Sequence, residues 1–201
     1  VVVPVALFAW SHRVAAVPVV TWWGIGLLFL AEELAYYWSH RLGHEVRWLW
    51  ASHVVHHSPR RIHFASAARL GLTETLSGGW LVHVPLYLFF PPKAVAAMFA
   101  LNLFYQFWLH TEMIGRLGPL EWVLNTPAHH RLHHARNAPY LDRNYGGILI
   151  VWDRLFGTFT EEREKCVYGT RGALNSWDPL WANFEVYWAL LKDSWHTRLW
   201  R

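Results

Sequence analysis

The chain contains one cysteine, Cys166, and few charged residues among its 201 positions. One cysteine excludes an intramolecular disulfide and a metal cluster built on thiolates. Charged residues make up 16% of the sequence, whereas soluble domains carry roughly 25%. The arginines and lysines flank apolar runs instead of gathering on a polar face, so we expect no nucleic-acid partner.

The residues present in excess are apolar and aromatic. Hydrophobic residues make up 54% of the chain, and tryptophan occurs 15 times. Indole side chains concentrate where an apolar layer meets water. We therefore predict an integral membrane protein, and the length suits a single domain covering residues 1–201.

Three apolar runs predict an all-α fold, a multi-span transmembrane helical bundle. The run 14–31 has 18 residues without a charge, and as a helix it would extend about 27 Å, close to the ~30 Å hydrocarbon core of a bilayer. The runs 75–90 and 94–109 flank Pro91 and Pro92, which predict a turn between two spans because proline ends a helix. We interpret residues 1–10 as the remnant of an earlier span.

The basic residues predict the orientation of this bundle. If the run 14–31 ends on the cytoplasmic side, the Pro-Pro turn lies outside with Arg13 and Lys93, and most other basic residues lie inside. An excess of Lys and Arg on the cytoplasmic side is the general rule. The same orientation places every histidine cluster in a cytoplasmic helical cap. The membrane would be the cytoplasmic membrane in a bacterium or the endoplasmic reticulum in a eukaryote.

Histidine is clustered at helical spacing. "YYWSHRLGHE" holds two histidines four residues apart, which share one face of a helix, and "HVVHH" and "HRLHH" repeat the offsets of three and four. One more histidine ends the third apolar run. The nine residues are His40, His44, His53, His56, His57, His110, His130, His133 and His134.

Nine imidazoles at this spacing indicate two metal ions, because one structural zinc takes about four ligands. Neutral imidazole binds iron, zinc, copper or nickel. The clusters contain no cysteine, which argues against iron–sulfur and blue-copper sites. Two ions with all-nitrogen ligands at a membrane face favour iron that activates dioxygen, and two zinc ions are the alternative.

The order of these motifs along the chain resembles the fatty acid hydroxylase / sterol desaturase superfamily of membrane di-iron oxygenases, and most closely its alkylglycerol monooxygenase-type branch. The resemblance runs from about Glu32 to Glu162. It is carried by the phrases "YYWSHRLGHE", "LWASHVVHHSP", "NLFYQFWLHTEMIGRLGPLEWVLNTPAHHRLHHARN" and "YLDRNYGGILIVWDRLFGTF". The resemblance implies a helical bundle with a cytoplasmic histidine cap, two iron ions as cofactors, and dioxygen-dependent hydroxylation or desaturation of a lipid.

The resemblance also implies roles for individual residues. Each of the nine histidines matches a position of the family's histidine boxes, with His110 as the histidine ahead of the last box, so all nine are predicted catalytic metal ligands. His129 lies beside the last box and is a candidate tenth ligand. The sequence departs from the family at His63, where relatives tend to carry asparagine, and this weakens inference about the substrate.

Four polar residues near the boxes are candidates to support the ligands, because a metal-bound histidine usually donates its second N–H to a carboxylate or carbonyl. The alternative is that they form surface salt bridges and turn caps. The four are Glu45, Asp142, Asn144 and Asp153. At the inner membrane edge, Glu32 and Glu33 are costly if they face lipid, so we expect them to turn toward the bundle or the site.

The predicted function is dioxygen-dependent di-iron hydroxylation of a fatty acyl, alkyl or sterol-like C–H bond. Its partners are a membrane lipid, dioxygen and an external electron donor, which is a reductase, a ferredoxin, a b-type cytochrome or, as the resemblance suggests, a reduced pterin. Desaturation by the same site is the nearest alternative. A non-redox metal-binding membrane protein and a zinc hydrolase are more distant ones, and clusters outside the spans count against metal transport.

Overall fold

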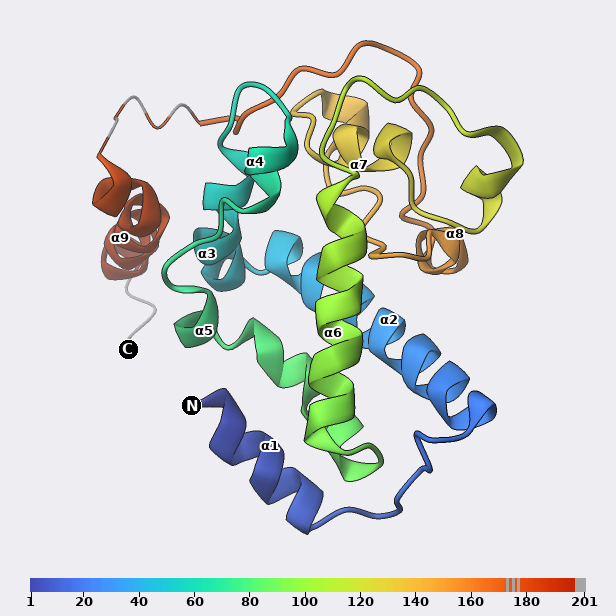
Figure 1. Ribbon diagram of the computed structural model, residues 1–201. Helices are drawn as coiled ribbons and strands as arrows, with labels where there is room; N and C mark the ends of the chain where they lie inside the picture. Colours follow the sequence, from blue (N-terminus) through green and yellow to red (C-terminus); the bar gives the residue numbers. More distant parts are fainter. Residues whose placement is uncertain (173, 175, 177, 198–201) are drawn as a thin grey trace.

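The computed structural model describes residues 1–172, 174, 176 and 178–197, and this part of the chain is mostly helical. Its only β pairings are two isolated antiparallel bridges, Leu124–Leu149 and Ala135–Tyr168. The all-α prediction is confirmed over the described residues. The helices form two regions, which we call the shaft and the cap (Figure 1).

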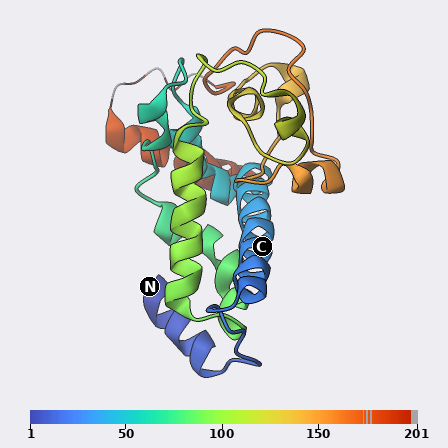
Figure 2. The ribbon, with the colours of Figure 1, turned by 45° about the vertical axis from the view of Figure 1, so that its right-hand side comes forward.

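The shaft consists of four elements that run along its length or cross its lower end (Figures 1 and 2). They are α1 (Val2–Ser11), the N-terminal half of α2 (Trp22–Glu45), the 3₁₀ helix η1 (Gly79–Leu88) and α6 (Pro92–Phe107). The cap holds the C-terminal end of α2, the 19-residue helix α9 and several shorter elements. These are α3 (Arg47–His57), α4 (Phe64–Ala67), α5 (Glu74–Ser77), η2 (Gly118–Trp122), α7 (Pro127–His133), η3 (Ala138–Tyr140), α8 (Val151–Phe156) and α9 (Pro179–Thr197).

Helix α2 joins the two regions. The Thr21 hydroxyl accepts the N–H of Gly24 and caps the N-terminus, which is where the helix starts. At the other end Val46 adopts an extended conformation, and α3 begins at the next residue. With 24 residues α2 is about 36 Å long, so it carries its last two turns from the shaft into the cap.

The structure corrects two of the predicted spans. The run 14–31 becomes helical only at Trp22, because the segment before it is extended around Pro18, with the N–H groups of Val14 and Val17 donating to Leu88 and Phe89. The run 75–90 is broken by Gly78, whose φ of 86° lies in the left-handed region, and then continues as a 3₁₀ helix.

The third run forms a helix, and the turn before it lies at the predicted position. Residues 94–107 lie in α6, and the chain turns at Pro91, which caps this helix. Helix α6 has 16 residues and is about 24 Å long. Within the described residues, no helix combines the length and the apolar character needed to cross a membrane.

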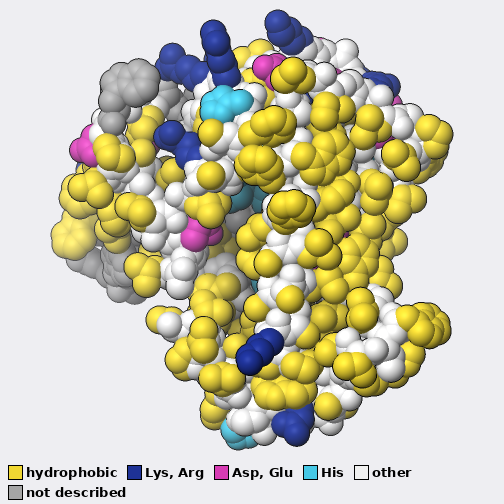
Figure 3. All heavy atoms as spheres, in the orientation of Figure 1, with side chains coloured by type: hydrophobic (Ala, Val, Ile, Leu, Met, Phe, Trp, Pro, Cys, Tyr) yellow, Lys and Arg dark blue, Asp and Glu magenta, His cyan; other side chains and the backbone are white. Residues whose placement is uncertain are grey.

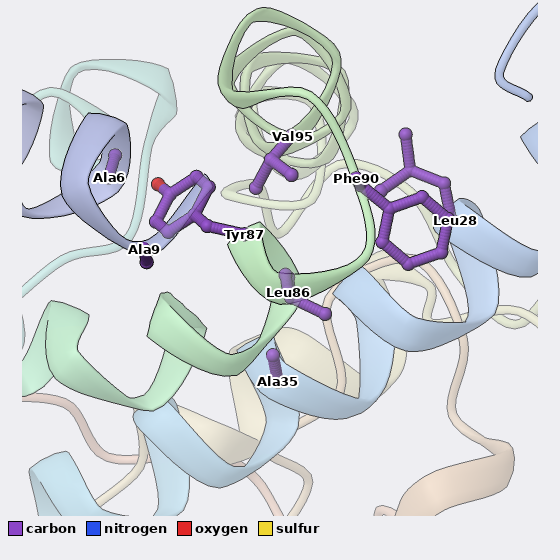
Figure 4. Close-up of a cluster of buried hydrophobic side chains, with 8 residues drawn as sticks. All are labelled: Ala6, Ala9, Leu28, Ala35, Leu86, Tyr87, Phe90 and Val95. Carbon is purple, nitrogen blue, oxygen red and sulfur yellow. The ribbon is translucent and has the colours of Figure 1, made fainter. Parts of the chain in front are cut away.

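The two regions have separate apolar cores. In the shaft, small side chains of α1 let that helix lie close to η1, and larger side chains of α2, η1 and α6 fill the centre (Figure 4). These residues are Ala6, Ala9, Leu28, Ala35, Leu86, Tyr87, Phe90 and Val95. In the cap a smaller cluster packs around Leu132 of α7 and includes Tyr140 and Cys166.

Candidate metal centre

The structure brings all nine predicted histidines together in the cap, in two groups. Within each group every ring offers a nitrogen that lies within 4.8 Å of the others. The first group is His40, His44, His53, His57 and His133, and the second is His56, His110, His130 and His134.

Helix geometry explains how each HxxHH motif serves both groups. On α3, His53 and His57 are one turn apart and face the first group, whereas His56 is rotated by about 100° from His57 and faces the second. On α7 the pattern is reversed, since His133 belongs to the first group and His130 and His134 to the second. The two groups therefore lie side by side between α3 and α7.

Backbone carbonyl groups fix the tautomer of four of the rings. A carbonyl oxygen only accepts, so the Nδ1 atom facing it carries the proton and Nε2 keeps its lone pair. The acceptors are Tyr145 O for His40 (2.8 Å), Arg143 O for His133 (2.9 Å), Gln106 O for His110 (2.9 Å) and Arg69 O for His56 (3.3 Å).

The Nε2 atoms of both groups converge on common centres. His110 Nε2 lies 2.9 Å from His130 Nε2 and 3.3 Å from His56 Nε2, and in the first group His53 Nε2 lies 3.1 Å from His57 Nε2. The Nε2 atoms of His40, His44 and His133 are buried without a hydrogen-bond partner. A ring nitrogen with a free lone pair is the atom by which histidine binds a metal ion. In such sites the nitrogens lie about 2.1 Å from the ion, and therefore roughly 3 to 3.5 Å from one another.

This arrangement fits a bound cation. The Nε2 lone pairs of His56 and His110 face each other and repel, because carbonyl groups hold the protons of both rings on Nδ1, and a buried acceptor without a partner is destabilising. A metal ion at each centre removes both costs. The donor set is therefore suited to two ions that accept neutral imidazole.

Burial keeps these rings in the neutral, ligating form. Loss of hydration, followed by the charge that neighbouring histidines would carry, lowers the pKa of His40 to about 3, and burial lowers the pKa of His110 to about 4. Burial is also the main cause that lowers the pKa of six others, namely His44, His56, His57, His130, His133 and His134. A proton therefore does not compete with a metal ion at neutral pH.

Buried carboxylates hold the loop 142–150 that supplies two of the carbonyl acceptors. The carboxylate of Asp153 accepts the N–H groups of Tyr145 (2.8 Å) and Gly146 (2.7 Å), and that of Glu33 accepts the N–H groups of Ile148 (3.0 Å) and Leu149 (2.7 Å). Both carboxylates are fully buried. They connect the far end of the loop to α2 and α8, and so fix the carbonyl that orients His40.

The four predicted supporting residues take different positions. Asp142 lies near a ring, with Oδ1 3.6 Å from His44 Nδ1. Asp153 and Asn144 act through the backbone instead, since the Asn144 side chain accepts the N–H of Thr160 and donates to its carbonyl. Glu45 forms an exposed ion pair with Arg41 (2.8 Å).

Glu32 and Glu33 turn inward, as expected. Asn102 of α6 donates to both carboxylates, and Oε1 of Glu32 is buried without a partner. Both side chains are fully buried, so Asn102 supplies the pair with a donor in place of water.

The candidate tenth ligand lies outside both groups. The His129 ring sits edge-on to Phe159, and its Nε2 is 4.0 Å from Glu121 Oε2. The offset of four would place it on the same face of α7 as His133, but its ring turns to Phe159 and Glu121 and is part of neither group. The structure thus argues against the interpretation of His129 as a ligand.

One residue near the groups was not found from the sequence. Glu74 on α5 places Oε1 3.8 Å from His53 Nδ1, the position that carbonyl groups occupy for other rings. In the sequence Glu74 precedes an apolar run, and its spacing from the histidine motifs does not indicate a contact with them. The four carbonyl acceptors are likewise invisible in a sequence, because every residue has a carbonyl.

A cavity of about 400 Å³ reaches both groups. His44, His57 and His133 of the first group and His134 of the second form its inner wall, and α9 closes the opposite side. The remaining wall is mixed, with Trp50 and Leu141 beside the charged Arg136 and Arg171. Its volume lies within the range of small-molecule sites.

Comparison with known proteins agrees with this geometry. Residues 25–158 match the sequence model of the fatty acid hydroxylase family. The chain is 41% identical to human alkylglycerol monooxygenase over 192 residues, which are 95% of this chain and 43% of the human protein. It is 45% identical to alkylglycerol monooxygenase of Danio rerio, over 88% of this chain and 39% of that protein. It is 37% identical to the ornithine lipid hydroxylase OlsE of Rhizobium tropici, over 63% of this chain and 39% of that protein.

The chain spans less than half the length of these relatives. No solved structure matches it. The family match covers the whole stretch from the first turn of α2 to the loop after α8, and with it every histidine of the two groups. On these grounds the chain belongs to the fatty acid hydroxylase family.

Proposed function

We propose that the protein hydroxylates a lipid at a C–H bond, using dioxygen and two iron ions held by the nine histidines. The observation that carries the proposal is the convergence of nine imidazoles in two groups, with cysteine absent from both. Relatives with the names alkylglycerol monooxygenase and ornithine lipid hydroxylase support a lipid substrate and the insertion of oxygen.

The residues of the chain have distinct tasks in this reaction. The Nε2 atoms hold the ions, and the carbonyl groups of Tyr145 and Arg143 keep the protons on the Nδ1 atoms of His40 and His133. Bound iron supplies the reduction and activation of dioxygen, of which one atom enters the C–H bond and the other leaves as water. Two electrons and two protons come from the external donor. The cavity wall keeps the substrate against the histidines and limits access of water.

The exposed surface of the shaft supports the hypothesis that this region is immersed in a membrane. Many large apolar side chains on its surface are exposed, among them Trp22 (87%), Leu101 (50%) and Phe104 (79%). Figure 3 shows apolar side chains over most of the shaft, with Lys and Arg gathered on the cap and near the lower tip. We propose that the apolar surface contacts lipid and that the cap faces the cytoplasm, in keeping with the distribution of basic residues.

A zinc hydrolase is the less favoured function. Catalytic zinc takes about three protein ligands and keeps a position open for water. The groups found here offer five and four histidines. A desaturase would use the same residues, and the oxygen content of the product distinguishes it from a hydroxylase.

The experiment that tests the proposal uses the chain purified without oxygen and loaded with ferrous iron. Alkylglycerol, ornithine lipid and free fatty acid are offered in mixed micelles under ¹⁸O₂, with a reduced pterin or a ferredoxin and its reductase as electron source. We expect two irons per chain and one ¹⁸O atom in an alcohol product. A new double bond without label indicates a desaturase. Activity that needs zinc and no dioxygen contradicts the proposal.

A further inference from the structure

Helix α9 has an inner face that fixes it to the cap. Ala182 and Asn183 are buried, and Asn183 Oδ1 accepts the N–H of Leu72 (2.7 Å). Tyr187 meets Trp48 of α3 edge-on, with ring centroids 4.9 Å apart, and Arg47 pairs with Asp193 (2.5 Å). The helix is thus docked on α3 and on the segment around Leu72.

The outer face of α9 is an apolar stripe. It is formed by Trp181, Phe184, Trp188, Leu191 and Trp195, which are 39% to 76% exposed. At about 100° per residue these five positions fall within an arc of roughly 80°, on the side opposite to Ala182 and Asp193, with Tyr187 between the two sides. Lys192 stands at the edge of the stripe, with Nζ 5.4 Å from the Trp188 ring.

The placement of α9 in the fold is as informative as its composition. In Figure 1 α6 stands upright while α9 is seen nearly end-on, and in Figure 2 α9 runs across the view. The two helices are therefore close to perpendicular. Both views put α9 at the level of the upper end of α6, where the apolar shaft meets the cap. If α6 follows the membrane normal, α9 lies in the plane of the membrane at its boundary.

We propose that α9 is an in-plane interfacial helix whose outer stripe binds the lipid surface. Three of the five stripe residues are indoles, the side chains that favour the layer between acyl chains and water. Lys192 at the edge of the stripe can extend its ammonium to lipid phosphates while its stem stays in the apolar layer. A helix of this kind lies at the depth that the exposed shaft defines, so lipid is the occupant that both the side chains and the geometry select.

The proposal bears on substrate entry. Ala182, Glu185 and Val186 on the inner side of α9 form a wall of the cavity that reaches the histidines. With α9 in the interface, this cavity lies at the depth of lipid headgroups. An amphiphile would reach it by a short displacement from the bilayer. This consequence rests on the proposed lipid hydroxylation, whereas the lipid contact of α9 rests only on the proposed immersion of the shaft.

Site-directed spin labelling tests the contact without reference to activity. Single cysteines are introduced by Phe184→Cys and Leu191→Cys in a Cys166→Ala background, labelled with a nitroxide, and reconstituted in vesicles of phosphatidylcholine and phosphatidylglycerol. Lys165→Cys, at an exposed position of the cap, is the matched control. Collision rates with dioxygen, which enriches in lipid, and with a water-soluble nickel complex are compared for each label.

We expect dioxygen to relax the labels at 184 and 191 several-fold more strongly than the nickel complex does, with the reverse order at 165. Strong relaxation by nickel at 184 and 191 means that the stripe faces water and overturns the proposal. Weak relaxation by both reagents means that protein covers the stripe, from a second copy or from another segment of a longer chain, and overturns it equally. None of these outcomes depends on iron or turnover, so failure here is distinguishable from failure of the proposed function.

Discussion

The cap and the shaft invert the usual distribution of polar and apolar side chains. In the cap, eight of the nine grouped histidines have strongly lowered pKa values because burial removes their hydration. In the shaft, large apolar residues such as Trp22 and Phe104 are exposed. The cap interior offers nitrogen donors that are suited to cations. The shaft exterior offers an apolar surface, which is suited to the lipid contact proposed above.

The difference predicts how each region responds to mutation. A buried polar residue of the cap has hydrogen bonds or a metal ion to lose, so its replacement is costly. An exposed apolar residue of the shaft packs against nothing in the chain, and its replacement changes mainly what the surface binds. The following predictions test this contrast, starting with the largest expected effect.

Removing a grouped histidine should abolish metal binding in one group. His133→Ala takes one Nε2 donor from the first group, and His130→Ala takes one from the second. Loss of an outer-shell partner costs about 10–100-fold in metal affinity or activity, so loss of a ligand should cost at least as much. We expect turnover to fall at least about 100-fold, and metal content to fall below two per chain in each variant.

The matched control for this pair lies on the same helix. His129→Ala removes a ring that faces Glu121 and Phe159 instead of either group. It should keep two metal ions per chain, as measured by inductively coupled plasma mass spectrometry. Loss of one ion in this variant, or full metal content in His133→Ala, would show that the ligand assignment is wrong.

Asp153 should matter more than Glu45, although both are acidic residues close to the histidine boxes. Asp153→Asn replaces an acceptor of two backbone N–H groups and the Thr158 hydroxyl with a side chain that can satisfy only part of them. We expect about 3 kcal/mol lower stability and roughly ten-fold weaker metal binding, since hydrogen bonds to buried charges contribute about 1.5–3 kcal/mol each.

Glu45→Gln supplies the comparison, because its exposed pair with Arg41 should contribute at most about 1 kcal/mol. Thermal unfolding in detergent and metal titration of both variants measure the difference. Equal effects of the two substitutions would mean that the loop 142–150 does not depend on the Asp153 carboxylate.

The metal-free protein should lose stability as the pH falls. Burial lowers the pKa of His40 to about 3 and of His110 to about 4 in the folded chain, whereas histidine in an unfolded chain titrates near about 6.5. Below pH 6.5 the unfolded state binds more protons, so the contribution is intact above this pH and is lost on the way down to about pH 4. Between pH 7 and pH 5 we expect the stability of the metal-free cap to fall by at least about 2 kcal/mol.

Bound metal should flatten this profile, because the ion competes with protons for Nε2. Thermal unfolding between pH 7 and pH 5, with and without iron, gives both curves. A metal-free protein that is as stable at pH 5 as at pH 7 contradicts the burial of neutral rings.

The cap was easier to predict from sequence than the shaft. Spacing of three and four residues predicted that His53 and His57 share a helix face, because that relation depends on local geometry alone. No single motif predicted that α3 and α7 would each contribute to both groups. The carbonyl partners of the rings could not be predicted from the sequence at all. In the shaft the apolar run 14–31 predicted a continuous helix, but Pro18 and the Thr21 cap delay its start to Trp22. A hydropathy profile averages side-chain polarity and therefore does not detect a proline or a helix cap.

The smallest effect on folding is expected on the outside of the shaft. Phe104 is 79% exposed on α6, whereas Leu28, inside the shaft core, is 2% exposed. In detergent Phe104→Ser should change the free energy of unfolding by less than about 0.5 kcal/mol, and Leu28→Ala should lower it by about 2–5 kcal/mol. In vesicles the difference in stability between the two variants should narrow, because Phe104→Ser then removes a lipid contact. The Phe104→Ser protein should also partition more weakly into the bilayer. Flotation of both variants with vesicles measures that partitioning. If Phe104→Ser leaves partitioning unchanged while Leu28→Ala is as stable as the parent protein, the division into an inner core and a lipid-facing surface is wrong for the shaft.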